Sequence, residues 1–73
     1  MTYTAFYPLS DELRRRGVDG PTAIAFERNT IAETMLKAKQ DGYRPTGQKP
    51  TVAWHPEGVH VFLQVEKVGT NVS

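Results

Sequence analysis

The sequence contains no cysteine and only two histidines, so several kinds of site chemistry are ruled out at the start. A disulfide framework, a thiolate nucleophile and a cysteine-ligated zinc ion all require cysteine. The chain also lacks an HExxH pair, a GxGxxG turn, a Walker-type glycine loop and an EF-hand pattern. We therefore expect no metal, no cofactor and no enzymatic activity.

An excess of charge of one sign is missing as well. Nine Lys and Arg residues stand against eight Asp and Glu residues, which gives a net charge of +1. This balance excludes a strongly basic nucleic-acid-binding coat and an acidic disordered tail. No apolar run approaches the roughly 18 residues of a membrane span, and residues 1–4 do not resemble the start of a signal peptide. We expect a cytoplasmic protein that does not insert into a membrane.

The chain is short, at 73 residues, and one domain over residues 1–73 is the expectation. A domain of this size has only a few kcal/mol of net stability, so it can hardly tolerate the packing that a deep catalytic cavity would remove. The size of the chain therefore favours binding over catalysis.

Valine and alanine are segregated along the chain. Six of the seven valines lie at or after Val52, whereas four of the six alanines lie within residues 23–38. Valine favours strands and alanine favours helices, so the middle is predicted to be helical and the C-terminal third to form a sheet. An N-terminal strand is predicted over Thr2–Tyr7, which is rich in threonine and aromatic residues and stops at Pro8.

Two helices are expected next. Residues 10–17 (SDELRRRG) combine a capping serine, early acidic residues, late arginines and a final glycine, which is typical of a short helix. A second helix is predicted over residues 30–41, and one interpretation extends it back to Pro21. In the other interpretation residues 22–28 alternate like a strand. The residues expected to face the core are Ile24, Ala25, Ile31, Ala32, Met35 and Leu36.

A β-hairpin closes the predicted fold. The segment 43–50 has two prolines and a glycine and is expected to be a loop. Strands over 51–55 and 59–67 then flank the sequence HPEG (55–58), which favours a type I turn followed by a left-handed glycine bulge. Together the elements predict a single α+β domain of order β-α-α-β-β, whose antiparallel sheet packs its C-terminal hairpin against the long helix.

The expected turn also predicts a register. Trp54 would lie opposite His60 and Val52 opposite Phe62. His55 and His60 would then fall on opposite faces and are not expected to chelate one metal, although a register slipped by one residue would bring them nearer. The residues expected to face the long helix are Ala53, Val59, Val61, Leu63 and Val65. The other face would then carry a patch of Val52, Trp54, His60 and Phe62.

That patch suggests the first functional hypothesis. Apolar patches on small proteins commonly mark interaction sites, and tryptophan is enriched at binding hot spots. The candidate protein-binding residues are Trp54, His60, Phe62 and Val52. The protein would then be a non-enzymatic adaptor or inhibitor that binds a larger protein assembly, similar in size and style to accessory proteins of phages and mobile elements. The alternative is that these aromatic residues form a second core.

The order of elements over residues 10–67 also resembles that of winged helix-turn-helix regulators. The resemblance implies that helix 30–41 is a DNA-recognition helix and hairpin 51–67 a wing. Groove contacts would come from Thr30, Thr34, Lys37 and Lys39, and phosphate contacts from Arg14, Arg15, Arg16, Arg44 and Lys49. A protein partner is the first expectation, with nucleic acid and a second copy of the chain as the alternatives.

Overall fold

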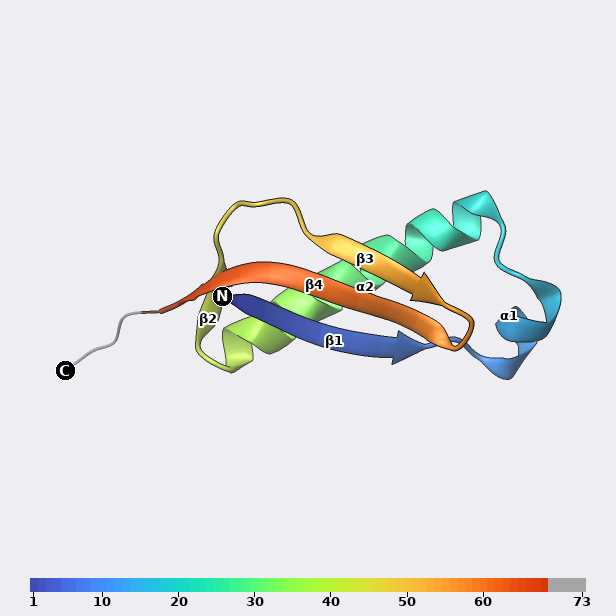
Figure 1. The fold of residues 1–73 in the computed structure, drawn as a ribbon, viewed down its shortest axis with the longest axis horizontal. Coiled ribbons are helices and arrows are strands. Elements are labelled where there is room, and N and C mark those ends of the chain that lie inside the picture. The colour runs from blue at the N-terminus through green and yellow to red at the C-terminus, as the bar shows by residue number, and fades with distance from the viewer. Residues whose placement is uncertain (69–73) are drawn as a thin grey trace.

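β4 is the central strand of a four-stranded antiparallel sheet in the computed structural model, which describes residues 1–68 (Figure 1). The elements are β1 (Thr2–Pro8), α1 (Asp11–Arg16), α2 (Gly20–Gln40), β2 (Tyr43–Pro45), β3 (Thr51–His55) and β4 (Gly58–Lys67). β1 pairs with one edge of β4, and β3 and β2 follow each other along the other edge. α2 runs diagonally behind the sheet, and no helix of the described part covers its front face (Figure 1). The predicted α+β class is confirmed.

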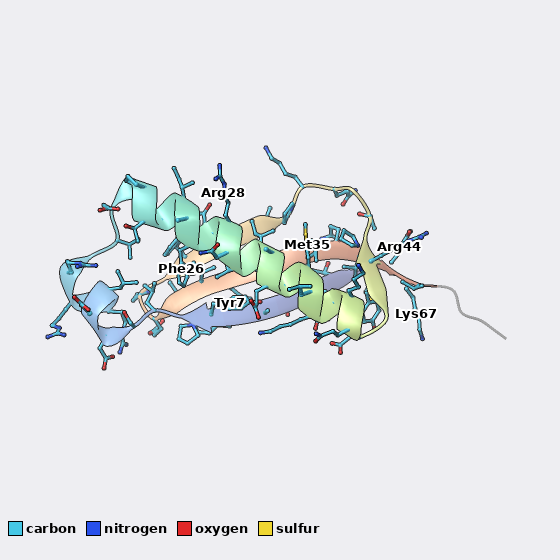
Figure 2. The ribbon with its side chains drawn as sticks, turned by 180° about the vertical axis from the view of Figure 1, so that it is seen from behind. Tyr7, Phe26, Arg28, Met35, Arg44 and Lys67 are labelled. Carbon is cyan, nitrogen blue, oxygen red and sulfur yellow. The ribbon has the colours of Figure 1, made fainter. Side chains whose placement is uncertain are left out.

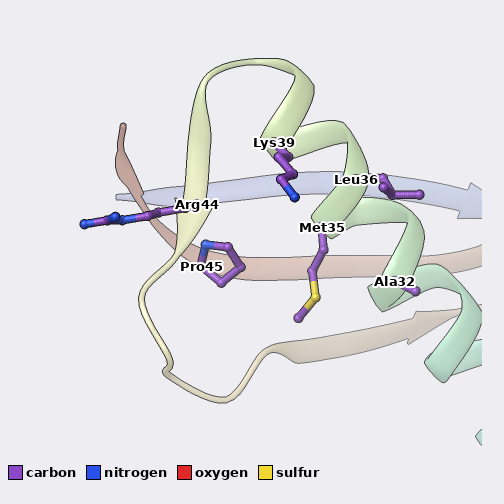
Figure 3. A pocket seen from close by; sticks show the side chains of 6 residues that line it. All are labelled: Ala32, Met35, Leu36, Lys39, Arg44 and Pro45. Atoms are coloured by element: carbon purple, nitrogen blue, oxygen red, sulfur yellow. The ribbon is translucent and has the colours of Figure 1, made fainter. Parts of the chain in front are cut away.

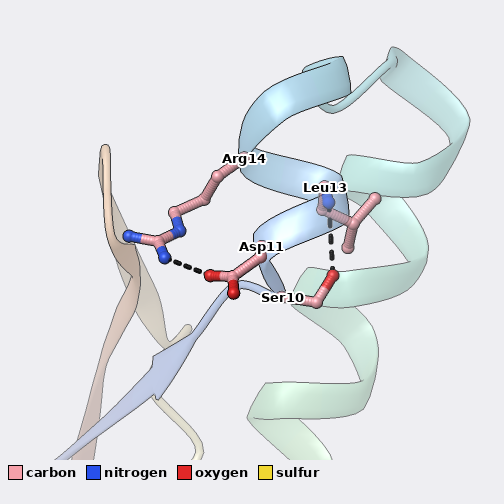
Figure 4. Close-up of polar contacts among 4 residues, drawn as sticks. All are labelled: Ser10, Asp11, Leu13 and Arg14. Atoms are coloured by element: carbon pink, nitrogen blue, oxygen red, sulfur yellow. Dashed lines mark hydrogen bonds and ion pairs between the residues drawn. The ribbon is translucent and has the colours of Figure 1, made fainter.

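Each helix begins at a capping residue, and the predicted cap of α1 is confirmed. Ser10 caps α1, because its hydroxyl oxygen accepts the Leu13 amide at 3.2 Å (Figure 4). Gly17 ends this helix with a φ of 87°, a conformation that glycine adopts without strain. Asp19 caps α2 by accepting the Thr22 amide at 2.8 Å. Hydrogen bonds from Thr22 hold the pKa of the Asp19 carboxyl below its ordinary value.

α2 is continuous over 21 residues, so the interpretation that extends the second helix back to Pro21 is confirmed and the strand over 22–28 is wrong. Pro21 stands in the first turn, where its missing N–H has no helical partner to lose. The helix therefore starts at the cap that Asp19 provides, and Thr30, where the predicted helix 30–41 would begin, lies inside it.

The face that α2 turns toward the sheet is not the predicted one. Thr30, Thr34 and Ala38 are the buried residues of this helix. The expectation that its large apolar residues pack on the sheet is wrong, because Ile24 is 59% exposed and Leu36 58% exposed. Of the six residues expected in the core, Ala25, Ala32 and Met35 are also exposed and only Ile31 is half-buried.

Aromatic side chains of the sheet explain this orientation. Three of them reach toward α2 and hydrogen-bond residues spaced seven apart, a set that we call the polar seam. Its contacts are Trp54 Nε1 to Glu27 Oε2 (2.6 Å), Tyr7 Oη to Thr34 Oγ1 (2.8 Å) and Tyr3 Oη to Asp41 Oδ2 (2.6 Å). Since the rings supply the apolar bulk and their polar tips need partners, α2 presents small and polar residues to the sheet.

The Tyr3–Asp41 contact of the polar seam gives a testable titration. Its hydrogen bond raises the pKa of Tyr3 from 10.0 to about 12. The folded state therefore favours neutral Tyr3, a stabilisation that is complete below pH 10 and is lost as the pH rises to about 12. We expect Asp41→Asn to return this ionisation toward 10, as measured by alkaline titration of tyrosinate absorbance. Tyr3→Phe removes the contribution of Tyr3 and so identifies it in the titration curve. Identical titration curves for the parent and Asp41→Asn would refute the assignment of this shift to Asp41.

The hairpin register differs from the predicted one by one residue. Trp54 lies opposite Val59, and Val52 lies opposite Val61. The turn has only two residues between the paired His55 and Gly58. Because side chains alternate along a strand, this shift moves Val52 and Trp54 to the α2 side of the sheet. The predicted inward row on β4 is confirmed, since Val59, Val61, Leu63 and Val65 are all buried.

Gly58 has a different role from the one predicted. The glycines with positive φ are Gly17, Gly42 and Gly47, so Gly58 does not form a left-handed bulge. Instead, a Cβ atom at Gly58 would lie 2.7 Å from Pro8 Cα and closer still to the carbonyl oxygen of Tyr7. The glycine is required because β1 passes directly against the start of β4. The shorter turn also places Val52 and Trp54 of β3 on the same face as the buried valines of β4, and Ala53, expected on that face, on the open face.

The predicted loop 43–50 contains one short strand, β2, which pairs Pro45 with Val65 of β4. β3 then resumes pairing along the same edge, with Thr51 opposite Phe62. The chain advances six residues from Pro45 to Thr51 while β4 advances only three, so the intervening segment bulges out from the sheet edge (Figure 1). This arrangement brings β2 beside the C-terminal half of α2.

Candidate functional site

The register divides the four predicted protein-binding residues between two faces. Val52 and Trp54 lie on the α2 side of the sheet, whereas His60 and Phe62 lie on the open face. Trp54 packs on Phe26 of α2 with ring centroids 5.8 Å apart and belongs to the polar seam. The predicted continuous patch of these four side chains therefore does not exist, and Trp54 is mainly a structural contact.

The open face carries a smaller aromatic cluster. His60 stacks on Phe62 with centroids 4.6 Å apart, and Phe6 meets His60 edge-on at 6.1 Å. His55 lies on this same face, 6.4 Å from His60, which corrects the expectation that the two histidines point to opposite sides. Within residues 1–68 no group of three potential ligands surrounds them. His60 and Phe62 are half-buried by this packing, whereas Phe6 stays 46% exposed beside them.

The predicted nucleic-acid-binding cations do not form one surface. Arg14 pairs with Asp11 (Figure 4). Arg16 lies 3.6 Å from Glu12, so local ion pairs engage two of the three arginines of α1. α1, which includes Arg15, lies at one end of the molecule, while β2, with Arg44, lies at the other (Figure 1).

The remaining predicted nucleic-acid contacts are also dispersed. Lys37 sits 4.7 Å above the ring of Tyr7, Lys49 stands in the segment before β3, and Arg44 pairs with Glu66 at 2.5 Å. Thr30 and Thr34, expected to face a DNA groove, are 5% and 0% exposed. Since these threonines are packed against the sheet, α2 cannot use that face as a recognition helix.

One flank of α2, beside the face that packs on the sheet, carries exposed aliphatic residues together with cations. Ile24, Arg28, Ile31, Met35 and Lys39 follow one another at spacings of three and four residues, and we call this row the α2 stripe. Figure 2 shows Arg28 and Met35 projecting from the same side of the helix. Leu36 borders the stripe and is largely exposed.

A groove adjoins the C-terminal half of the α2 stripe, between α2 and β2 (Figure 3). It has a volume of about 580 Å³ and is lined by Ala32, Met35, Leu36, Lys39, Arg44 and Pro45. The Met35 side chain projects into the space between the helix and β2 (Figure 3). Arg44 contributes its stem, since its guanidinium is turned outward to Glu66. The floor is therefore apolar and Lys39 is the cation at its rim.

Sequence reasoning missed this site because it assigned Met35 and Leu36 to the core. One signal could have found it. Glu27, Thr34 and Asp41 recur every seven residues, a polar row that competes with the apolar row for the sheet. A second requirement, the approach of Pro45 to α2, depends on the pairing of β2 with Val65 and has no local signal.

Neither described helix is long and apolar enough to cross a membrane. Comparison with protein-family models, with curated proteins and with solved structures found no match for this chain. The class defined by the structure is a small α+β protein with one helix-covered sheet face and an exposed groove beside that helix.

Proposed function

We propose that this chain is a non-enzymatic module that docks onto a larger protein, as an adaptor or inhibitor, through the α2 stripe and its groove. The carrying observation is the orientation of α2, which packs threonines against the sheet and leaves Ile24, Met35 and Leu36 exposed. Large aliphatic side chains gathered around a concave site are characteristic of protein-binding surfaces. We place the module in the cytoplasm, because small secreted domains commonly depend on disulfides and this chain has no cysteine.

The open face of the sheet is the less favoured docking surface. His60 and Phe62 stack on each other and are half-buried, and Phe6 is 46% exposed, whereas Leu36 and Ile24 are both more than half exposed. His60 and Phe62 remain predicted contacts for a partner large enough to reach around the sheet edge. Trp54 and Val52 are not needed as contacts in this proposal.

The test is retention of a partner from the native host by the tagged chain, compared between matched variants. Met35→Glu puts a charge in the groove, and we expect it to reduce recovery of the retained protein by at least about tenfold. Asn29→Glu makes the same kind of change at an exposed position of α2 outside the stripe and should retain the partner. Leu36→Glu serves as a second groove variant, and circular dichroism verifies that each variant is folded.

Recovery of the same protein by the parent, Asn29→Glu and Met35→Glu alike would overturn the proposed surface. Loss with His60→Ala and Phe62→Ala, but not with the groove variants, would move the docking site to the open face. Loss with Met35→Glu and Leu36→Glu alone supports the groove.

A further inference from the structure

We infer that the occupant of this groove is an amphipathic helical segment of a partner protein with acidic residues along its borders, an inference that rests on the proposed function. The argument depends on the charges that accompany the apolar residues of the α2 stripe. Helix-in-groove recognition uses apolar anchors at helical spacing, and the charges at its rim select among partners.

The α2 stripe carries charge of only one sign. Arg28 and Lys39 alternate with Ile24, Ile31 and Met35, and both cations are exposed. Within residues 1–68 neither of them makes an ion pair. Glu33 is two residues from Met35, and at about 100° per residue it lies on the opposite side of the helix. An apolar row with unpaired cations on both sides of Met35 is complementary to an apolar segment bordered by carboxylates.

Two acidic residues, Glu27 beside Arg28 and Glu66 beside the groove residue Arg44, already have hydrogen-bond partners within the chain. Glu27 accepts the Trp54 indole N–H at 2.6 Å, and Glu66 pairs with Arg44 at 2.5 Å. Glu27 keeps its charge while it accepts this neutral indole donor, but within residues 1–68 neither carboxylate forms an ion pair with Arg28 or Lys39. Lys49 is exposed in the segment that joins β2, a wall of the groove, to β3. A partner's carboxylates would thus meet positive charge along the length of the stripe.

Two other occupants fit less well. A second copy of this chain bound by two-fold symmetry would bring Arg28 and Lys39 of one copy toward the same residues of the other, and like charges oppose such pairing. An anionic lipid surface would satisfy the charges, but it is flat on this scale and cannot fill a groove walled by Pro45. A helix or short helical segment can fill a concave site of about 580 Å³ with a few anchor side chains.

The probes are two designed peptides of about 18 residues, long enough to form a helix. Both carry leucine along one face, and the borders of that face are glutamate in one peptide and lysine in the other. We expect the glutamate peptide to shift the amide resonances of the α2 stripe and β2, with at least about tenfold tighter binding than the lysine peptide. In the double variant Arg28→Glu/Lys39→Glu the preference should reverse, and Met35→Glu should weaken binding of both peptides.

The outcomes separate this inference from the proposed function. Equal binding of both peptides at the stripe would overturn the acidic specificity and leave the groove as a docking site. Binding of neither peptide, with retention of the partner still dependent on Met35, would overturn the inference alone. Co-sedimentation with anionic vesicles in place of peptide binding, or self-association abolished by Met35→Glu, would assign the stripe to a membrane or to a dimer. Retention that is independent of Met35 would overturn the proposed function itself.

Discussion

Gly58→Ala is expected to destabilise the protein by about 3 kcal/mol, because the added methyl group collides with backbone rather than with a movable side chain. A Cβ atom at this position would lie 2.7 Å from Pro8 Cα, and the carbonyl oxygen of Tyr7 would be nearer still. Since β4 pairs there with β1 and β3 at once, neither neighbour can withdraw without breaking ladder hydrogen bonds. Denaturant-induced unfolding measures the change.

Two further variants identify the cause. Gly20→Ala makes the same substitution where no atom lies within 4 Å, and the free energy of unfolding should stay within about 0.5 kcal/mol of the parent. Gly58→Asn separates close approach from a left-handed bulge, because asparagine tolerates positive φ but is larger than alanine. We expect it to be at least as harmful as Gly58→Ala. A mild effect of asparagine with a severe effect of alanine would restore the bulge and the register that follows from it.

Local signals predicted the elements of this fold well. The caps at Ser10 and Gly17 join residues that are close in sequence. The alternation of valines along β4 directly indicates which of its side chains are buried. The sequence allows α2 to start at either Pro21 or Thr30. The structure starts it at the cap formed by Asp19, whose carboxylate accepts the amide of a residue only three positions away, Thr22. Interactions between residues within about four positions of each other could therefore be predicted from the sequence.

The hairpin register could not be predicted in the same way. The sequence HPEG (55–58) is compatible with a two-residue turn and with a longer loop ending in a glycine bulge, and the two differ by one residue in pairing. The choice depends on β1, which presses on Gly58 from a segment fifty residues away. A one-residue difference in register moves Trp54 from the open face to the α2 side, so the predicted patch of four side chains does not form.

The face of α2 also depends on partners distant in sequence. Hydrophobic periodicity assumes that the apolar side of a helix packs inward, which requires the facing surface to be apolar. Here that surface includes the phenol of Tyr7 and the indole of Trp54, which carry polar tips and select hydroxyl and carboxylate partners on the helix. The candidate site is therefore a consequence of which sheet residues point toward α2, and the polar row Glu27, Thr34 and Asp41 is the trace of it in the helical sequence.

The orientation of α2 is tested by Thr34→Leu, which is expected to destabilise the protein by about 2 kcal/mol. Thr34 is 0% exposed, and its hydroxyl donates to the Thr30 carbonyl oxygen at 2.7 Å. That hydroxyl also accepts the Tyr7 hydroxyl at 2.8 Å, since its own proton is already committed. Leucine is larger than the space and leaves the Tyr7 hydroxyl without its partner. Equilibrium unfolding in denaturant measures the loss, and Thr34→Val separates the polar contribution from the volume.

Leu36→Glu is the matched change on the opposite side of the same helix, two residues away. Leu36 is 58% exposed, so a charged side chain there remains in water, and the free energy of unfolding should change by no more than about 0.5 kcal/mol. A helix turned the other way would give the reverse pattern, with Thr34→Leu tolerated and Leu36→Glu unfolding the protein. That reversal would make Met35 and Leu36 core residues and remove the surface on which both proposals depend. The observed pairing of Thr34 with Tyr7 requires the first pattern, because no other rotation of α2 brings that hydroxyl to the sheet.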